Sequence, residues 1–292
     1  MTPRALAALL VLAALWGGSF PFMRAAVSEF GPLPMMALRA WIGAAVLLPM
    51  LWLSGRMGAL RERTGFALAV GISNSALPFA LFAWGQQFVA AGLNAILNAT
   101  TPFWTALIAW LWLGEQLDRR RTAGLLIGFG GVLLLAWERA NFYIGGSGWA
   151  ILAALLASCS YGFSASFMRR YLTGVNPLAV ATASQLSAGL LLSPFALASL
   201  PAHLPSPGAW AAVALLGVFC TGIAYAIFFW LIETVGAARA TTVTLLVPLF
   251  AVLWGSLLLD ERVSWDMALA GIVILAGTAL TLAPASKPPA AA

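Results

Sequence analysis

Ten apolar runs, each about 20 residues long, follow one another along this chain, separated by short breaks rich in charged residues, proline and glycine. A helix of about 20 residues, rising 1.5 Å per residue, crosses the hydrocarbon core of a lipid bilayer. The sequence therefore predicts an all-α membrane protein with ten transmembrane helices. The runs lie near residues 5–27, 34–54, 65–87, 92–113, 120–138, 147–168, 177–198, 208–231, 237–258 and 265–283.

The composition supports a bilayer as the main surroundings of the chain. Hydrophobic residues make up 62% and charged residues 8% of the 292 residues, against roughly 45–50% and 25% in soluble domains. The net charge of +6 comes from basic residues that lie mostly in the breaks between runs. This placement is typical of membrane topology and not of a nucleic-acid-binding face, so no nucleic-acid partner is expected.

The residue types that form disulfides or hold metals are scarce. The two cysteines, Cys159 and Cys220, lie within apolar runs, and the single histidine, His203, lies in the loop PAHLPSP. We expect the cysteines to be small buried hydrophobic residues and the histidine to be solvated. The sequence therefore predicts no metal and no cofactor. The expected partners are the lipid bilayer and a small-molecule substrate, and a monomer is one possible state.

The basic residues orient the predicted helices. With the N-terminus in the cytoplasm, eleven of them fall on the cytoplasmic side, three on the outer side and one, Arg39, within the second run. Such an excess is the positive-inside pattern, so we predict a bacterial inner-membrane protein with both termini in the cytoplasm. The cytoplasmic set is Arg4, Arg56, Arg61, Arg63, Arg119, Arg120, Arg121, Arg169, Arg170, Arg239 and Lys287, and the outer set is Arg24, Arg139 and Arg262.

A twelve-residue segment occurs twice, as WGGSFPFMRAAV at residues 16–27 and as YGFSASFMRRYL at residues 161–172. A shift of 145 aligns residues 16–49 with residues 161–194 without a gap. Runs one to five thus repeat as runs six to ten, and because five is odd the second copy enters the membrane from the opposite side. A shift of 146 aligns the later runs, placing Trp84 on Trp230, Pro102 on Pro248 and Glu115 on Glu261.

We therefore predict two inverted five-helix repeats, residues 1–140 and 141–284, followed by a disordered tail, residues 285–292. Inverted repeats recur in secondary transporters, whose substrate site lies near the membrane midplane between the repeats. The sequence contains no phosphate-binding lysine motif, no metal-ligand cluster and no nucleophile–base arrangement. We expect a transporter that works by alternating access and not an enzyme. A membrane enzyme or a scaffold is the alternative from another class.

Four segments resemble the drug/metabolite transporter superfamily in its ten-helix EamA-type branch, and the resemblance covers nearly the whole chain. They are ALWGGSF, ALRAWIGAAVLLP, PFWTALIAWLWLGEQL and PLFAVLWGSLLLDERV. The resemblance implies a two-times-five bundle that exports small metabolites, and well-known members similar to this chain export amino acids, including aromatic ones. Export of other amphipathic compounds or drugs is the alternative. The short four-helix members carry a glutamate in their first helix for proton-coupled cation export, whereas here the first acidic residue is Glu29, beyond the first run.

A site on the axis between inverted repeats is expected to be lined by matched positions from both halves. Matched aromatic, hydroxyl and amide residues occur in runs one and six, three and eight, and four and nine, and the mid-run amide of Asn74 joins them. Packing or hydrogen bonding between helices is the alternative role for these side chains. The predicted substrate-binding residues are Trp16 with Tyr161, Ser19 with Ser164, Ser75 with Thr221, Phe79 with Tyr225, Asn98 with Thr244, and Asn74.

Pro102 and Pro248 are predicted helix kinks, because a proline leaves the carbonyl four residues earlier without its donor. The freed carbonyls are those of Asn98 and Thr244. They either line a cavity or accept a hydrogen bond from a neighbouring hydroxyl. The fourth run also carries polar residues at the spacing of one helical face, namely Asn94, Asn98, Thr101 and Thr105.

The nine carboxylates lie at the ends of runs or in the breaks. Because a charge at mid-membrane is costly and usually functional, transport is not expected to depend on a carboxylate there, and neutral or zwitterionic cargo fits better than a permanent cation. Arg39 is expected to snorkel to the outer surface or to pair with Glu29, with a substrate carboxylate as the alternative partner. Gly124, Gly128 and Gly131 are expected to permit close packing within the bundle, with homodimerisation as the alternative.

Overall fold

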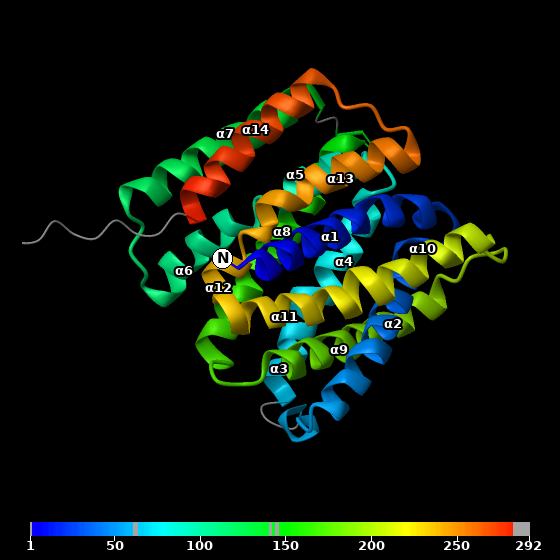
Figure 1. The fold of residues 1–292 in the computed structure, drawn as a ribbon. Helices are drawn as coiled ribbons and strands as arrows, with labels where there is room; N and C mark the ends of the chain where they lie inside the picture. The colour runs from blue at the N-terminus through cyan, green and yellow to red at the C-terminus, as the bar shows by residue number, and fades with distance from the viewer. Residues whose placement is uncertain (1, 61–63, 140–141, 144–145, 283–292) are drawn as a thin grey trace, which may run out of the picture.

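The computed structural model describes residues 2–60, 64–139, 142–143 and 146–282, and this part of the chain contains helices and no strand (Figure 1). The predicted all-α membrane fold is confirmed. Eight helical stretches of the described part are long and apolar enough to cross a membrane, when Leu68–Gly85, Ala91–Leu113 and Pro207–Val235 are each counted as one stretch, and Val243–Leu259 is a shorter apolar helix. The predicted tail, residues 285–292, and the predicted boundary between residues 140 and 141 lie outside the described residues.

The helices follow the predicted apolar runs, and proline and small polar residues begin several of them. Thr2, Asn176 and Ser206 each cap a helix with a side-chain oxygen and are each followed by a proline, which needs no hydrogen-bond partner in the first turn. The first half contains α1 (Pro3–Phe30), α2 (Pro32–Leu53), α3 (Thr64–Gly71), α4 (Leu77–Gly85), α5 (Ala91–Asn98), α6 (Thr101–Leu113) and α7 (Arg119–Arg139). The second half contains α8 (Ser147–Tyr171), α9 (Pro177–Ala198), α10 (Pro207–Gly217), α11 (Ala224–Val235), α12 (Ala237–Ala240), α13 (Val243–Leu259) and α14 (Trp265–Leu282).

Two π-helical segments interrupt the third and eighth predicted runs at matched positions. The segment η2 (Ile72–Ala76) joins α3 to α4, and η3 (Val218–Ile223) joins α10 to α11. The first residues of the two segments, Ile72 and Val218, coincide at the same shift of 146 that aligns the later runs. Pro78, just after η2, cannot donate to the carbonyl of Asn74, which favours a local change of hydrogen bonding. Single π-helical turns occur frequently at functional sites.

The ends of α6 and α13 are also built alike. Gly114 and Asp260, which are matched at a shift of 146, both adopt left-handed backbone conformations, with φ of 71° and 52°. In each case the next residue, Glu115 or Glu261, donates its backbone N–H to a carbonyl six residues earlier, over 3.2 Å. The sequence repeat is therefore accompanied by the same backbone conformation at the ends of α6 and α13.

The fourth and ninth predicted runs are not single continuous helices. A turn at residues 99–100 separates α5 from α6, and a turn at residues 241–242 separates α12 from α13. Hydroxyls from neighbouring helices satisfy carbonyls beside the first turn, because Ser158 donates to the carbonyl of Leu97 and Thr278 donates to that of Ala99. Such satisfaction is what permits a helix to break at membrane depth.

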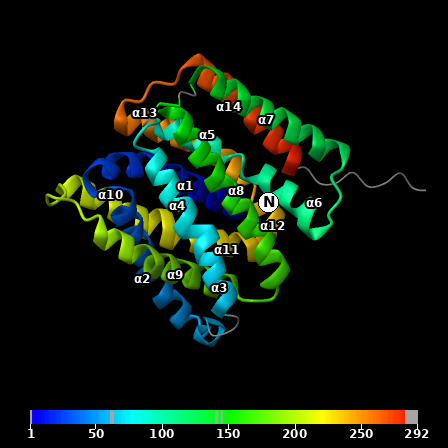
Figure 2. The ribbon, with the colours of Figure 1, turned by 180° about the vertical axis from the view of Figure 1, so that it is seen from behind.

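The two halves interleave instead of lying side by side (Figures 1 and 2). Helix α1 packs mainly against α13, α10 and α11 of the second half, while α8 packs against α4, α5 and α6 of the first half. Helices α2 and α9, which occupy matched places in the two halves, pack against each other. The first helix of each half thus runs through the other half, and the centre of the molecule is shared.

Helices α7 and α14 form a closely packed pair at one side of the bundle (Figure 1). A Cβ atom on Gly124 or Gly131 would lie within 3.0 Å of backbone atoms of α14, and one on Gly128 would lie about 2.0 Å from the ring of Phe103. The expectation that these glycines permit close packing within the bundle is confirmed.

Candidate functional site

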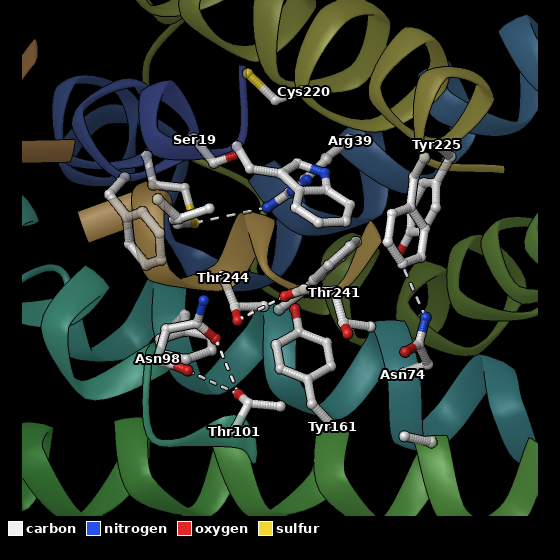
Figure 3. A pocket seen from close by; sticks show the side chains of 18 of the residues that line it. Ser19, Arg39, Asn74, Asn98, Thr101, Tyr161, Cys220, Tyr225, Thr241 and Thr244 are labelled. Atoms are coloured by element: carbon white, nitrogen blue, oxygen red, sulfur yellow. Dashed lines mark hydrogen bonds between the residues drawn. The ribbon is translucent and has the colours of Figure 1, made fainter. Parts of the chain in front are cut away.

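A cavity of about 250 Å³ lies at the centre of the interleaved halves (Figure 3). Ligand pockets have volumes of roughly 300–1,000 Å³ for drug-sized compounds, so this cavity suits a small metabolite. Its walls come from α1, α2, η2, α4, α5, α6, α8, η3, α11 and α13 and from the turn after α12.

The lining repeats the symmetry of the sequence. Eight pairs of matched positions supply 16 of the 19 lining residues, and the three others are Ser19, Arg39 and Thr241. The cavity is therefore lined mostly by matched positions of the two halves. The pairs are Trp16 with Tyr161, Phe20 with Ala165, Met23 with Met168, Asn74 with Cys220, Phe79 with Tyr225, Phe82 with Phe228, Asn98 with Thr244, and Thr101 with Val247.

Eight of the eleven residues predicted to bind substrate line this cavity. The structure brings together side chains from six predicted runs that are far apart along the chain. These eight are Trp16, Ser19, Asn74, Phe79, Asn98, Tyr161, Tyr225 and Thr244.

The other three predicted residues, Ser75, Ser164 and Thr221, are fully buried outside the lining. The Ser75 hydroxyl lies 2.8 Å from that of Ser184 and accepts a hydrogen bond from the side chain of Gln185 over 3.0 Å. Thr221 donates to the carbonyl of Leu216 over 2.9 Å. Ser75 and Thr221 therefore hydrogen-bond within the protein behind the cavity wall, which is the alternative role considered for polar side chains in the membrane.

Aromatic rings form two opposite walls through equivalent contacts. The rings of Trp16 and Phe228 have centroids 5.1 Å apart. Their counterparts in the other half, Tyr161 and Phe82 respectively, have ring centroids 6.1 Å apart. Figure 3 shows the side chain of Asn74 directed toward Tyr225, and the Asn74 amide donates to the Tyr225 hydroxyl over 3.2 Å. The cavity thus offers flat apolar faces together with a few oriented polar groups.

The polar stripe predicted for the fourth run is divided by the turn between α5 and α6. Asn98 and Thr101 line the cavity. Asn94 instead donates to the carbonyl of Phe82 over 3.0 Å and to the side chain of Gln86 over 2.7 Å, and so joins α5 to the end of α4. The stripe does not form one continuous polar face, because the helix that would carry it ends at Asn98.

The two predicted kinks lie in different surroundings. Pro102 lies in the first turn of α6, and the carbonyl of Asn98 accepts a hydrogen bond from the Thr101 hydroxyl over 2.8 Å. Pro248 lies within α13, beyond the turn at residues 241–242. The side chains of Asn98 and Thr244 reach the cavity from these two helical regions.

The expectation for Arg39 was wrong. The residue is 7% exposed and lines the cavity. Glu29 instead accepts hydrogen bonds from the backbone and hydroxyl of Ser206 at the start of α10. Arg39 is held inward because its Nε donates to the Thr221 hydroxyl over 3.0 Å and its guanidinium lies 4.0 Å from the ring centroid of Phe79.

Several lining residues lie at matched positions that are apolar and identical in the two halves, and the prediction from polar and mixed aromatic pairs does not include them. Met23 and Met168, which are identical between the two copies of the repeated segment, both line the cavity. Phe82 and Phe228 are likewise identical at a shift of 146. Applied to apolar identities as well, the matched-position criterion finds these four residues.

The lining offers binding groups and no recognisable catalytic set. Among the described residues, no group of three or more His, Cys, Asp or Glu side chains could hold a metal ion. The lining holds one formally charged residue, Arg39, and no carboxylate. The arrangement can enclose, stack against and hydrogen-bond a small molecule.

Comparison with known proteins agrees with this geometry. The EamA-like transporter family matches residues 3–137 and again residues 148–283. The uncharacterised inner membrane transporter YedA of Escherichia coli strain K12 is 30% identical over 283 residues, covering 94% of this chain and 90% of the relative. An uncharacterised Pseudomonas aeruginosa protein is 32% identical over 281 residues, covering 94% of each chain. A crystal structure that is 20% identical shares the fold, with a TM-score of 0.69 over 96% of this chain and 98% of its own.

The helical bundle and these relatives define the class as a multi-pass membrane transporter. Within that class, the chain belongs to the EamA-like transporter family.

Proposed function

We propose that this transporter exports small neutral or zwitterionic metabolites, namely amino acids including aromatic ones, across the inner membrane by alternating access. The observation that carries the proposal is the central cavity, in which 16 of 19 lining residues come from matched positions of the two halves. A site shared equally by two inverted halves can face either side of the membrane as the halves rock about it.

A difference between the matched glutamates supports alternating access. The Glu261 carboxylate accepts hydrogen bonds from the backbone N–H of Ala91 over 2.9 and 3.0 Å, at the start of α5. Its counterpart Glu115 pairs with Arg121 over 3.7 Å and with Arg169. Two glutamates at matched positions, each following the same backbone cap, therefore have different partners. This difference is expected when two inverted halves adopt unequal conformations in one state. In the opposite state we expect these roles to exchange.

The chemistry of the cavity supports an amphipathic cargo of amino-acid size. The rings of Trp16, Tyr161 and Tyr225 present surfaces on which an aromatic side chain can stack, at about 0.5–1.5 kcal/mol beyond area burial. The oxygens of Asn98 and Thr244 can accept hydrogen bonds from an ammonium group. A purely apolar cargo offers no hydrogen-bond donor to these oxygens.

The test is counterflow in proteoliposomes that contain the purified protein. We expect saturable uptake of labelled phenylalanine or tryptophan when the lumen is preloaded with the unlabelled amino acid. Protein-free liposomes give the background, and Tyr225→Ala should lower the flux because it removes a cavity ring and the acceptor of the Asn74 hydrogen bond. Absence of saturable flux for amino acids would contradict the proposal. Saturable flux of amphipathic cationic dyes alone would favour export of other compounds.

A further inference from the structure

Arg39 breaks the symmetry of the cavity. The position matched to it, at a shift of 145, is Ser184. Ser184 is buried outside the cavity lining, and its hydroxyl is hydrogen-bonded to that of Ser75. The lining is otherwise almost entirely paired, and Arg39 is its one charged member. The two halves therefore supply a similar shape, while the first half alone supplies a cation.

This guanidinium has no carboxylate partner among the described residues. The ion pairs of that part of the chain use other arginines, since Arg56 pairs with Glu233 and both Arg121 and Arg169 pair with Glu115. The ionisable side chains that line the cavity with Arg39 are those of Tyr161, Tyr225 and Cys220, and none of them is a carboxylate. A buried cation without a counter-charge is expensive in a membrane protein and is usually functional.

The contacts of Arg39 orient its unused donors. A guanidinium has five N–H donors in one plane; Nε donates to Thr221, and Nη1 lies 3.8 Å from the sulfur of Met23, a weak acceptor. Stacking on Phe79, with the guanidinium carbon 4.0 Å from the ring centroid, fixes the plane of the group. The remaining N–H groups meet no acceptor among the described residues, and Figure 3 shows Arg39 at the cavity beside the labelled polar side chains.

We propose that Arg39 binds the carboxylate of the cargo, and that the transporter selects small carboxylates with an aromatic or apolar body over the corresponding amines and amides. The inference rests on the proposed function in treating this cavity as the transport site. A planar carboxylate matches the two-pronged N–H edge of a guanidinium and neutralises its charge. The body of the cargo then lies against the rings of Trp16 and Tyr161, which line the same cavity.

The single charge favours a carboxylate over a phosphate ester. A phosphate monoester carries close to two negative charges at neutral pH, whereas the lining holds one cation. The second charge would remain uncompensated at membrane depth, where this is costly. A monoanion, or a zwitterion held by its carboxylate, matches the charge of the site.

The decisive test is a ligand series on the purified wild-type protein in detergent, read by isothermal titration calorimetry. We expect phenylalanine and 3-phenylpropanoate to bind at least about tenfold more tightly than phenylalaninamide and phenethylamine, since a hydrogen-bonded ion pair contributes about that much or more. Phenyl phosphate is expected to bind more weakly than 3-phenylpropanoate. Equal binding of acid, amide and amine would overturn the proposal, and tighter binding of the phosphate would replace the carboxylate with a phosphate.

Variants then assign the effect to Arg39. Arg39→Gln is expected to weaken binding of 3-phenylpropanoate by about 10- to 100-fold. It is not expected to weaken binding of phenethylamine, because this ligand is itself a cation and the substitution removes a like charge. Arg39→Lys should bind more tightly than Arg39→Gln and more weakly than the wild type, because lysine keeps the positive charge but lacks the paired N–H groups that bind a carboxylate bidentately. Arg56→Gln, which changes a half-exposed surface arginine, is the matched control. If Arg39→Gln does not fold, Arg39→Lys and the wild-type ligand series still decide the matter.

The same experiments separate this inference from the proposed function. Carboxylate-selective binding without counterflow would support the role of Arg39 and contradict amino-acid export. Counterflow of amino acids that is equal in the wild type and in Arg39→Gln would support export and contradict the role of Arg39.

Discussion

At the scale of single residues, the aromatic side chains of the cavity have two roles that sequence periodicity cannot separate. Trp16 and Tyr161 each contact a phenylalanine of the other half, at centroid separations of 5.1 and 6.1 Å. Both also line the cavity and are only partly buried. They therefore pack between helices on one side and remain available to a ligand on the other.

This double role gives a prediction for paired cysteine variants. Cysteine placed singly at Trp16, Tyr161, Phe79 or Tyr225, in a background lacking the two native cysteines, is expected to react with a water-soluble thiol reagent. Phenylalanine is expected to slow the reaction at both members of a pair, because both face the same space. The measurement is the labelling rate with and without ligand.

The control for the labelling experiment is Ser164→Cys, since Ser164 is matched to the cavity residue Ser19 but is itself fully buried outside the lining. It should label slowly, and phenylalanine should not change its rate. Protection at one member of a pair only would show that the site is asymmetric in its aromatic walls as well as in its charge.

At the scale of helices, glycine decides how closely α7 and α14 approach. A Cβ atom on Gly277 of α14 would lie 2.5 Å from the backbone nitrogen of Gly128 and 2.6 Å from the carbonyl oxygen of Gly124. These are main-chain atoms, which cannot rotate away. The two helices would therefore have to separate along their length.

We accordingly expect Gly277→Ala to lower the free energy of unfolding by about 1–3 kcal/mol, the usual cost of overpacking. Gly130→Ala, on the same pair of helices, is the matched control, because its Cβ meets no atom within 4 Å. That variant should be neutral or stabilised by up to about 1 kcal/mol through helix propensity. Thermal unfolding of both variants in detergent measures the difference, and equal stabilities would contradict the packing described for Gly277.

At the scale of the whole molecule, the interleaving of the halves explains why one cavity can be symmetric. Helix α1 lies among helices of the second half and α8 among helices of the first. Each half thus contributes its first helix to a part of the bundle formed mainly by helices of the other half. Such sharing of a central cavity is what the proposed alternating access between two halves requires.

The orientation of the whole molecule follows from the distribution of basic residues. In the predicted topology eleven of them fall on one side and three on the other, so we predict that both termini are cytoplasmic. A fluorescent protein fused to the C-terminus should fluoresce in cells, and alkaline phosphatase fused there should be inactive. A fusion with the opposite pattern would reverse the topology or change the number of spans.

The sequence alone was sufficient to predict the fold class, the approximate helix positions and many of the residues that line the cavity. Apolar content over about 20 residues is a local property that decides whether a segment enters the bilayer. The internal repeat then adds long-range information, because a pair such as Asn98 and Thr244, or Phe79 and Tyr225, must occupy equivalent places in any pseudo-symmetric assembly. Both pairs line the cavity.

Only the tertiary structure decided which way individual polar side chains face. A helix that is apolar all round has no dominant face in its sequence, so nothing local distinguished Ser19, which lines the cavity, from Ser75, which lies behind it. The direction of Arg39 depends on Thr221 and Phe79, which belong to other helical segments far away in the sequence. Hydrophobicity determines insertion segment by segment, whereas the facing of a side chain is determined by neighbours that come together only when the two halves interleave.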